Sequence, residues 1–449
     1  MRREKMAEKK ISSKTYLVKR HVFDAFSLGK ADGCFCATSS YGCKAKGGIL
    51  AYGTGMRYLS INGVDLISPE PLLDFSFAPY NTSIGRISLP ILSTTQGVYY
   101  LAEPLKDFEK VITTGNRVKL LSLPGEDGYM RLACVLRNAL WRFGIGCWFS
   151  KMCDGTFSKA ACVFENRLFV VGADDKLQYS APYAYADFTD SADEGGFVRL
   201  MEYVSTPTQL VALKEEMYCF CNEGLYRVTG GSAARDFKVE KVDYVGGVIY
   251  EGSAAACGDR VLFMTPDGLF GVKNGKVQPM DTHGQLKGVV PYPSAEAAAT
   301  GNKYFLPCTL YGENRTLTVD LSTGECAYTQ FSSVLCSFDG GVYGADENRR
   351  LFAYAAGYPL PSAPFFERKG ESFGDEKDKT LTSVKLYGSG KITLRVVGRN
   401  GSREKQVQLT KEGTIVPIAL KGKRFDVRIT LSLDAQVTGL EAETQRLYR

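Results

Sequence analysis

Histidine chemistry has little material in this chain. The 449 residues include only two histidines, His21 and His283, so a general base or a histidine-rich metal site would have to use one of them. His283 follows Asp281 in the turn-like sequence Asp-Thr-His-Gly-Gln, which we interpret as a capped loop rather than a catalytic pair. The sequence contains neither a phosphate-binding Gly-x4-Gly-Lys-Ser/Thr motif nor a Gly-x-Ser-x-Gly nucleophile motif.

The thirteen cysteines are an odd number, which does not favour a disulfide framework. Several of them, including Cys219 and Cys336, lie within apolar runs, where a free thiol behaves as a small hydrophobe. One group resembles a metal site, but its cysteine spacings of one and six residues do not match zinc-binding pairs. It consists of His21, Cys34, Cys36 and Cys43. We therefore expect reduced core or loop thiols, and we predict no metal and no other cofactor.

One acidic segment holds carboxylates that could act in pairs. A glycosidase needs two carboxylates about 5–9 Å apart, and a weak calcium site needs several oxygen ligands. A solvated acidic loop is the favoured interpretation. The segment contains Asp187, Asp190, Asp193 and Glu194. The nearest match to a sialidase repeat, residues 154–157, places Asp154 directly before Gly155 and is read as a turn. We predict no catalytic residue and no enzymatic activity.

The composition is that of a globular protein with many turns. Hydrophobic residues make up 44%, aromatic residues 12% and charged residues 23%, and there are 47 glycines. The net charge of +6 is too small to predict nucleic-acid binding by itself. No apolar run reaches the roughly 18 residues of a membrane helix, and the charged start of the chain lacks the apolar core of a signal peptide. We expect a soluble protein made in a cytoplasm, with no membrane partner.

Short strands joined by two-residue turns recur between residues 21 and 360. Turns at positions 175, 223 and 267 are 48 and 44 residues apart. A period of about 40–50 residues is typical of the four-stranded blade of a β-propeller, and the length allows six to eight blades, of which seven is our prediction. A series of β-sandwiches is the alternative. The turns are Asn62-Gly63, Asp174-Asp175, Glu223-Gly224, Asp267-Gly268, Asn274-Gly275 and Asp339-Gly340.

Helical patterns are scarce. Residues Arg131–Phe143 fit a short helix or a strand equally well, and Ala295–Thr300 fits a helical turn. Neither segment changes the predicted class, which is all-β.

A second module follows the propeller. Residues 1–20 are predicted to be a charged tail or docking arm, residues 21–360 the propeller, and residues 361–449 a C-terminal antiparallel β-sandwich of six alternating strands. From 376 to 449 the chain has fifteen Lys or Arg and eight Asp or Glu, a net charge of +7. Such a charge could contact an acidic partner or could protect exposed sheet edges from aggregation.

An ordered pattern of residues recurs in the middle of the chain and in the C-terminal module. Its residues are Asn166, Arg167, Leu168, Gly172, Tyr179, Ser180, Pro182, Phe188, Leu210, Phe220, Gly224, Leu225, Tyr226, Val228, Gly258, Asp259, Val261, Phe263, Asp267, Gly268, Phe270, Phe365, Phe366, Lys379, Leu381, Val384, Leu386 and Gly388. With this pattern, the chain over about 160–290 and 360–449 resembles the β-propeller structural proteins of tailed-phage virions, the family of packaged-DNA stabilisation and tail-nozzle proteins. The segment Tyr183–Ala186 departs from the family pattern, which more often has an acidic or Asn-Pro turn leading to Trp.

The resemblance implies a non-enzymatic protein of the virion tail, made in the cytoplasm of a bacterial host. It implies self-association into a symmetric ring, contact with other tail or connector proteins and passive contact with DNA. The ring would form part of a tail, nozzle or connector that seals or extends the DNA conduit. Two alternatives remain at this point: a glycan-binding or glycan-cleaving propeller of a tail tip, and a cellular propeller that serves as a scaffold.

Overall fold

The chain folds into two compact units. The computed structural model describes residues 5–11, 14–23, 38–40, 43–46, 49–52, 56–61, 63–82, 85–101, 107–143, 149–172, 176–191, 195–198, 200, 207–221, 224–231, 236–244, 247–281, 286–310, 313–322, 325–354, 365–373, 376–432 and 435–447. These residues form strands and turns and no α-helix, so none of them provides a helix able to cross a bilayer. The propeller unit comprises Arg57–Leu317 and Gln330–Tyr354, and the sandwich unit comprises Met1–Met56, Thr318–Thr329 and Ala355–Arg449.

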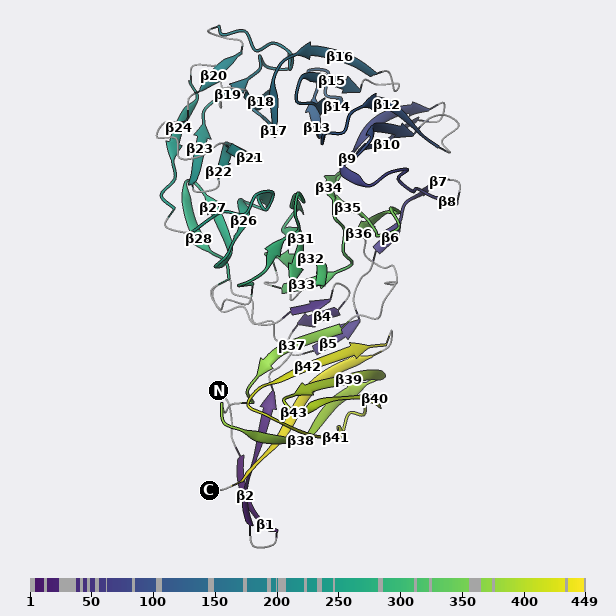
Figure 1. The fold of residues 1–449 in the computed structure, drawn as a ribbon, viewed down its shortest axis with the longest axis vertical. Helices are drawn as coiled ribbons and strands as arrows, with labels where there is room; N and C mark the ends of the chain where they lie inside the picture. The colour runs from purple at the N-terminus through teal and green to yellow at the C-terminus, as the bar shows by residue number, and fades with distance from the viewer. Residues whose placement is uncertain are drawn as a thin grey trace. The chain divides into compact units, whose positions relative to one another are not determined.

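The propeller unit is built from antiparallel sheets that follow one another along the chain (Figure 1). Blade 1 contains β9 (Leu72–Thr82), β10 (Gly85–Thr94), β11 (Gly97–Leu101) and β12 (Phe108–Thr113). Blade 2 contains β13 (Lys119–Pro124), β14 (Met130–Val135), β15 (Ala139–Phe143) and β16 (Phe149–Asp154). Blade 3 contains β17 (Phe157–Phe164), β18 (Arg167–Gly172), β19 (Leu177–Tyr179) and β20 (Gly196–Val198).

The remaining blades continue this order. Blade 4 contains β21 (Pro207–Leu213), β22 (Glu216–Cys221), β23 (Gly224–Thr229) and β24 (Lys238–Lys241). Blade 5 contains β25 (Ala255–Cys257), β26 (Arg260–Thr265), β27 (Gly268–Lys273) and β28 (Lys276–Pro279). Blade 6 contains β29 (Val290–Pro291), β30 (Ala298–Thr300), β31 (Lys303–Leu310) and β32 (Glu313–Asp320). Blade 7 contains β34 (Leu335–Phe338), β35 (Gly341–Ala345), β36 (Leu351–Tyr354) and β6 (Met56–Tyr58).

The innermost strands close a ring. Each contacts the next in the order β9, β13, β17, β21, β25, β30 and β34, and β34 contacts β9 again. The predicted fold class is therefore confirmed: the chain is all-β, with a β-propeller of seven blades in the described residues and a C-terminal β-sandwich.

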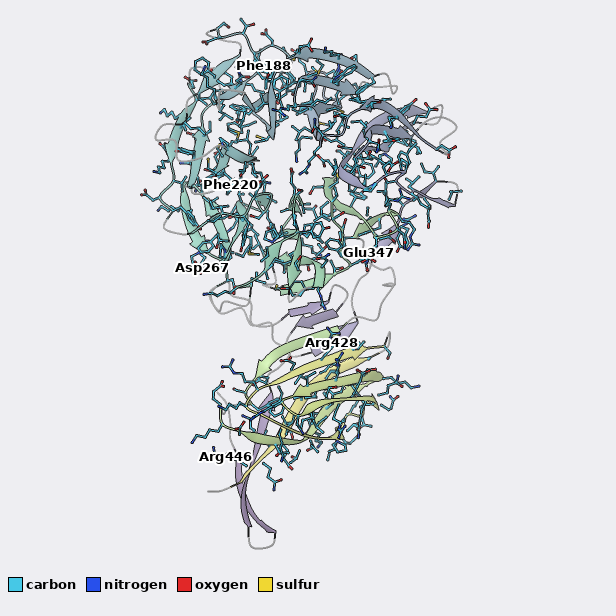
Figure 2. All side chains as sticks on the ribbon, viewed as in Figure 1. Phe188, Phe220, Asp267, Glu347, Arg428 and Arg446 are labelled. Carbon is cyan, nitrogen blue, oxygen red and sulfur yellow. The ribbon has the colours of Figure 1, made fainter. Side chains whose placement is uncertain are left out.

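Apolar residues fill the space between neighbouring blades. Phe220 of blade 4 and Phe263 of blade 5 are almost fully buried, and their ring centroids lie 5.4 Å apart (Figure 2). Equivalent clusters join blades 1 and 2, blades 2 and 3, blades 3 and 4, and blades 7 and 1. Because each blade is apolar on both faces, it can bury them only between two neighbours, which favours the closed ring.

Local turn chemistry sets the hairpins of the blades. Asn274-Gly275 and Asp339-Gly340 are two-residue loops with positive φ at both positions, 50° and 69° in the first and 45° and 71° in the second. This is the geometry that Asn-Gly and Asp-Gly favour, as predicted. The predicted turn Asp267-Gly268 is one residue out: Thr265 pairs with Gly268, so the loop is Pro266-Asp267.

The two helical interpretations are replaced by strands. Arg131–Phe143 forms parts of β14 and β15 with a short turn between them. The predicted helical turn at Ala295–Thr300 was wrong, because Ala298–Thr300 is strand β30 and pairs with β31. Alanine has the highest helix propensity, but propensity is a weak preference, and pairing within the blade overrides it.

The end of the propeller sequence is joined to its beginning. Strand β6 comes from the start of the unit and forms the outer strand of blade 7 beside β36. The backbone N–H of Leu59 donates to Leu351 at 2.8 Å, and the N–H of Leu351 donates to Leu66 at 2.8 Å. The hairpin of β7 (Ser60–Ile61) and β8 (Val64–Asp65) follows β6. We call the pairing of β6 with β36 the ring closure.

Side chains reinforce the ring closure. The buried Asp346 carboxylate accepts hydrogen bonds from the Tyr58 hydroxyl at 3.1 Å and from Arg350 Nε at 2.9 Å. The Arg350 guanidinium also donates to the Tyr58 hydroxyl at 2.8 Å and lies 4.1 Å from the centre of its ring. These contacts join residues almost 300 positions apart in the sequence.

The sandwich unit has two sheets. The first has the order β1 (Lys5–Ile11), β2 (Lys14–Phe23), β43 (Gln436–Leu447), β38 (Lys379–Ser389) and β41 (Thr414–Gly422); β5 (Ile49–Tyr52) pairs with β43, and β4 (Cys43–Lys46) pairs with β5. The second has the order β33 (Glu325–Thr329), β3 (Thr38–Ser40), β37 (Phe365–Glu371), β42 (Phe425–Leu431), β39 (Lys391–Gly398) and β40 (Gly401–Gln408). The alternating buried residues of β38 to β43 form one core.

The N-terminal segment takes part in this sandwich. Residues 1–20, which the sequence predicts to be a tail or arm, contain β1 and most of β2, and β2 pairs with β43 from Tyr16 to Phe23. The strands β3, β4 and β5 also pair within the sandwich unit, and the propeller unit begins at Arg57 rather than at residue 21. The propeller sequence is therefore inserted between β5 and β37.

We predict that Asp346→Ala lowers the free energy of unfolding of the propeller by about 2–3 kcal/mol, because hydrogen bonds between charged groups are lost from a buried position. The matched variant is Asp259→Ala, which removes an exposed carboxylate paired with Arg260 and Lys273 in blade 5. It should cost less than about 1 kcal/mol. Urea unfolding of both variants measures the difference, and equal losses would show that the ring closure does not depend on Asp346.

Candidate functional site at the end of the central channel

Four charged residues meet where the innermost strands begin. Lys119 is the first residue of β13, with Arg117 two residues before it. Asp74 lies near the start of β9, and Glu296 lies two residues before β30. Ion pairs join Arg117 and Lys119 directly to Glu296, and Asp74 acts on Lys119 through its charge. The four residues therefore gather at one end of the ring of innermost strands. We call the group Asp74, Arg117, Lys119 and Glu296 the channel bridge.

The Glu296 carboxylate is held by two cations from blade 2. Arg117 Nη2 lies 2.9 Å from Glu296 Oε1, and Lys119 Nζ donates to Glu296 Oε2. Arg117 also donates through Nη1 to the backbone oxygen of Ser294 at 3.0 Å. Asp74 accepts the backbone N–H of Leu120 at 3.0 Å. The bridge therefore connects blade 2 to blade 6, with blades 7 and 1 between them on the shorter way around the ring.

The bridge lies largely out of solvent. The side chains of Arg117, Lys119 and Glu296 are 16%, 17% and 19% exposed, and Asp74 is buried. Burial acts to lower the pKa of Lys119, but the charges of Glu296 and Asp74 outweigh it, and the pKa of Lys119 is raised. Burial also raises the pKa of Asp74. Lys119 therefore keeps its proton more firmly than a free lysine does.

This arrangement is suited to holding blades together. Each oxygen of Glu296 is paired with a cation of blade 2, which fixes the carboxylate in place. Within the described residues, no three His, Cys, Asp or Glu side chains gather in a way that could hold a metal ion. The chemistry that the channel bridge supports is electrostatic attraction between blades that are not neighbours.

The residues of the metal-like group do not add a site to the described structure. Cys34 and Cys36 lie outside the described residues. His21 pairs with Ala442 in the sheet register, and Cys43 pairs with Tyr52. The cysteines whose burial is described are free thiols, and all except Cys153 are buried, as expected of core thiols: Cys134, Cys153, Cys162, Cys219, Cys221, Cys257, Cys308, Cys326 and Cys336.

The acidic segment lies in the loop between β19 and β20. Asp187 Oδ1 accepts the backbone N–H of Thr189 at 3.0 Å. Hydrogen bonds from the Thr189 side chain and then from its backbone lower the pKa of Asp187. The backbone of Asp190 forms an isolated β-bridge with Gly195. Asp193 and Glu194 lie outside the described residues. An acid whose pKa is lowered is ionised at neutral pH, which is the opposite of what a glycosidase proton donor needs.

Two other candidate positions also belong to turns. Asp154 ends β16 and Phe157 begins β17, so residues 154–157 connect two blades, as predicted. Asp281 is buried, and its Oδ2 accepts the backbone N–H of Leu286 at 2.6 Å across the loop that contains His283. His283 itself lies outside the described residues.

Sequence reasoning missed the channel bridge. Arg117 and Glu296 are 179 positions apart, and each lies among residues that have no motif of their own. Their only local signal is a charge two residues before a strand, β13 for Arg117 and β30 for Glu296. Such a charge can be assigned to an ion pair between blades only when the strand is known to be the innermost strand of its blade.

Comparisons with known proteins add no functional assignment. No protein-family model and no curated protein matches the chain. Similar solved structures include virginiamycin B lyase from Staphylococcus aureus, with 12% identity, a TM-score of 0.44 and coverage of 66% of this chain and 98% of that chain. BamB from Moraxella catarrhalis has 9% identity, a TM-score of 0.41 and coverage of 80% and 96%. YCF48 bound to D1 peptide has 9% identity, a TM-score of 0.44 and coverage of 69% and 100%. Likenesses this weak say nothing about what this chain binds.

We predict that Glu296→Gln lowers the free energy of unfolding of the propeller by about 1–3 kcal/mol, because it leaves two largely buried cations without their shared carboxylate. Glu240→Gln is the matched control, since Glu240 is exposed and lies 3.7 Å from Arg227 in the same unit. Its cost should be near zero. Denaturant unfolding that gives the same loss for both variants would contradict a structural role for the channel bridge.

The raised pKa of Lys119 gives the bridge a defined pH dependence. A lysine whose folded pKa exceeds the ordinary 10.5 stabilises the fold fully below that pH, and the stabilisation is lost as pH rises through the folded pKa. Lys119→Met should therefore melt below the wild type at neutral pH, and the gap should shrink at strongly alkaline pH. Lys276→Met, an exposed control, should show no such change. A Lys119→Met gap that stayed constant through the alkaline range would be evidence against this assignment.

Proposed function

We propose that this chain is a non-enzymatic structural protein of a tailed-phage or prophage virion. It forms part of a tail, nozzle or connector ring that seals or extends the DNA conduit. The observation that carries the proposal is the closed cycle of seven innermost strands, joined to a sandwich built from both ends of the chain. Closure leaves few exposed strand edges, which makes the propeller a stiff body suited to symmetric assembly.

Two further observations support this role. The segments that carry the family resemblance, about 160–290 and 360–449, contain strands of the propeller unit and of the sandwich unit respectively. The channel bridge also ties blade 2 to blade 6 beside the start of their innermost strands, β13 and β30. In this proposal the DNA conduit lies between copies of the chain and not through the propeller of one copy.

The two alternative functions require different features of this chain. A glycan-cleaving propeller needs a poised acid, and Asp187 is instead an ionised cap of a turn. A cellular scaffold would use the same stiff ring with a protein partner. It differs from the virion role in where the chain is found, so the test has to follow the protein in the cell.

The test is to induce tailed particles from a strain that encodes this chain and to separate them on a density gradient. We expect the protein to sediment with the particles, in a copy number that is a multiple of the ring symmetry, as measured by quantitative mass spectrometry. Major tail proteins in the same fractions serve as the control. A protein found only outside the particle fractions would overturn the virion role and favour a cellular scaffold.

A further inference from the structure

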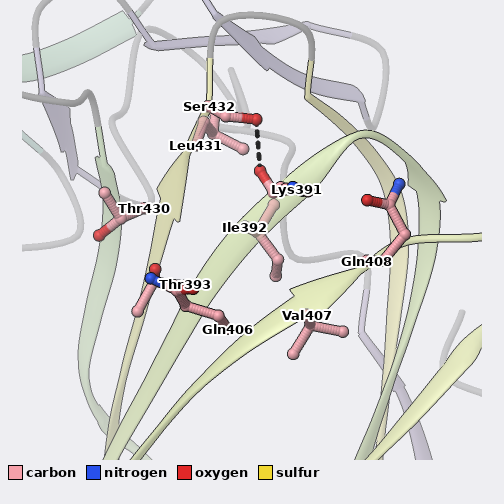
Figure 3. Close-up of a pocket in the computed structure, with 9 residues that line it drawn as sticks. All are labelled: Lys391, Ile392, Thr393, Gln406, Val407, Gln408, Thr430, Leu431 and Ser432. Atoms are coloured by element: carbon pink, nitrogen blue, oxygen red, sulfur yellow. Dashed lines mark hydrogen bonds between the residues drawn. The ribbon is translucent and has the colours of Figure 1, made fainter.

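The sandwich unit contains a pocket of about 450 Å³ at one end of strands β42, β39 and β40 (Figure 3). This volume is within the range of about 300–1,000 Å³ that is typical of small-molecule sites. Nine residues line the pocket, three consecutive ones from each of β39, β40 and the end of β42. They are Lys391, Ile392 and Thr393, then Gln406, Val407 and Gln408, then Thr430, Leu431 and Ser432.

The strand register arranges the polar side chains in rows. Thr393 pairs with Thr430 on one side and with Gln406 on the other, so these three residues share one face of the sheet. Lys391 pairs with Gln408 in the neighbouring row. The apolar members, Ile392, Val407 and Leu431, are buried in the sandwich core, whereas the polar members are partly or fully exposed.

Two polar side chains are fixed by the backbone at the end of the pocket. Gln408 Nε2 donates to the carbonyl of Gly390 at 3.2 Å, and Ser432 Oγ donates to the carbonyl of Lys391 at 2.7 Å (Figure 3). The Gln408 side-chain amide thus uses one N–H in a hydrogen bond within the protein, and its oxygen can accept a hydrogen bond from a ligand. Fixed polar groups of this kind lose little conformational entropy when a ligand binds.

The chemistry of the lining selects a class of ligand. Threonine hydroxyls and glutamine amides both donate and accept hydrogen bonds, which matches the hydroxyl groups of a sugar. Among the described residues, Lys391 is the single charged side chain of the lining and no carboxylate lines the pocket. The surrounding module, residues 376–449, has a net charge of +7, so an anion is favoured over a cation.

We propose that this pocket binds a saccharide unit that carries a carboxylate, with Lys391 facing the carboxylate and Thr393, Gln406 and Thr430 facing the hydroxyls. The proposal does not rest on the virion role: the pocket lies within one sandwich and needs no second copy of the chain. The two can therefore fail separately, since one is tested by sugar binding and the other by particle association.

The test measures binding of trigalacturonate to the full chain by isothermal titration calorimetry, with maltotriose as the neutral sugar. We expect trigalacturonate to bind and to weaken about tenfold or more in Lys391→Gln, which corresponds to about 1.4 kcal/mol. Thr393→Val should weaken it as well. Maltotriose should bind less well than trigalacturonate, and added salt should reduce the difference between them.

The matched control is Lys405→Gln. Lys405 is an exposed lysine of β40 next to Gln406, and it pairs with Leu394, so it lies on the opposite face of the sheet. Removal of its charge should leave trigalacturonate binding unchanged, and unaltered melting temperatures should show that the variants fold. The proposal is overturned if trigalacturonate does not bind at about 10 mM, if maltotriose binds equally well, or if Lys391→Gln behaves like Lys405→Gln.

Discussion

The pairing of β6 with β36 turns a row of sheets into a ring, and the rest of the propeller depends on it. Every blade buries its two faces against neighbours, so a row without closure would leave the first and last blades with an open apolar face and an unpaired edge. The chain must bring together residues almost 300 positions apart to close the ring. That entropic cost grows only slowly with loop length, and a cooperative set of contacts offsets it. The polar cluster around Asp346 belongs to that set.

The channel bridge complements this closure at the centre of the ring. Closure joins the two ends of the blade series at its rim, whereas the bridge joins blades that are not neighbours. Both use a carboxylate that accepts from two partners, and both draw their partners from distant parts of the sequence. A ring fixed at its rim and at its centre resists distortion, and such stiffness is the property that the proposed assembly role requires.

Local rules allowed much of the fold to be predicted, and non-local pairing explains what was missed. The Asn274-Gly275 turn and the alternating strands of the C-terminal sandwich depend on residues that are close in sequence. Their patterns can therefore be recognised from the sequence alone. Strand β1 carries mostly charged residues and β2 has no clear alternation, and β43, the partner of β2, lies at the other end of the chain. For the same reason the pair of Arg117 and Glu296 could not be predicted, because the two residues come together only when their strands meet in the ring.

The most direct test of the closed ring is amide hydrogen exchange, followed residue by residue. The N–H groups of Leu59, Leu66 and Leu351 donate to one another's carbonyls at the ring closure, each at 2.8 Å. If the ring is closed, these three amides exchange as slowly as those of β18 and β26 inside other blades. If they exchange as fast as a frayed chain end while the other blades stay protected, the ring is open and the account is wrong.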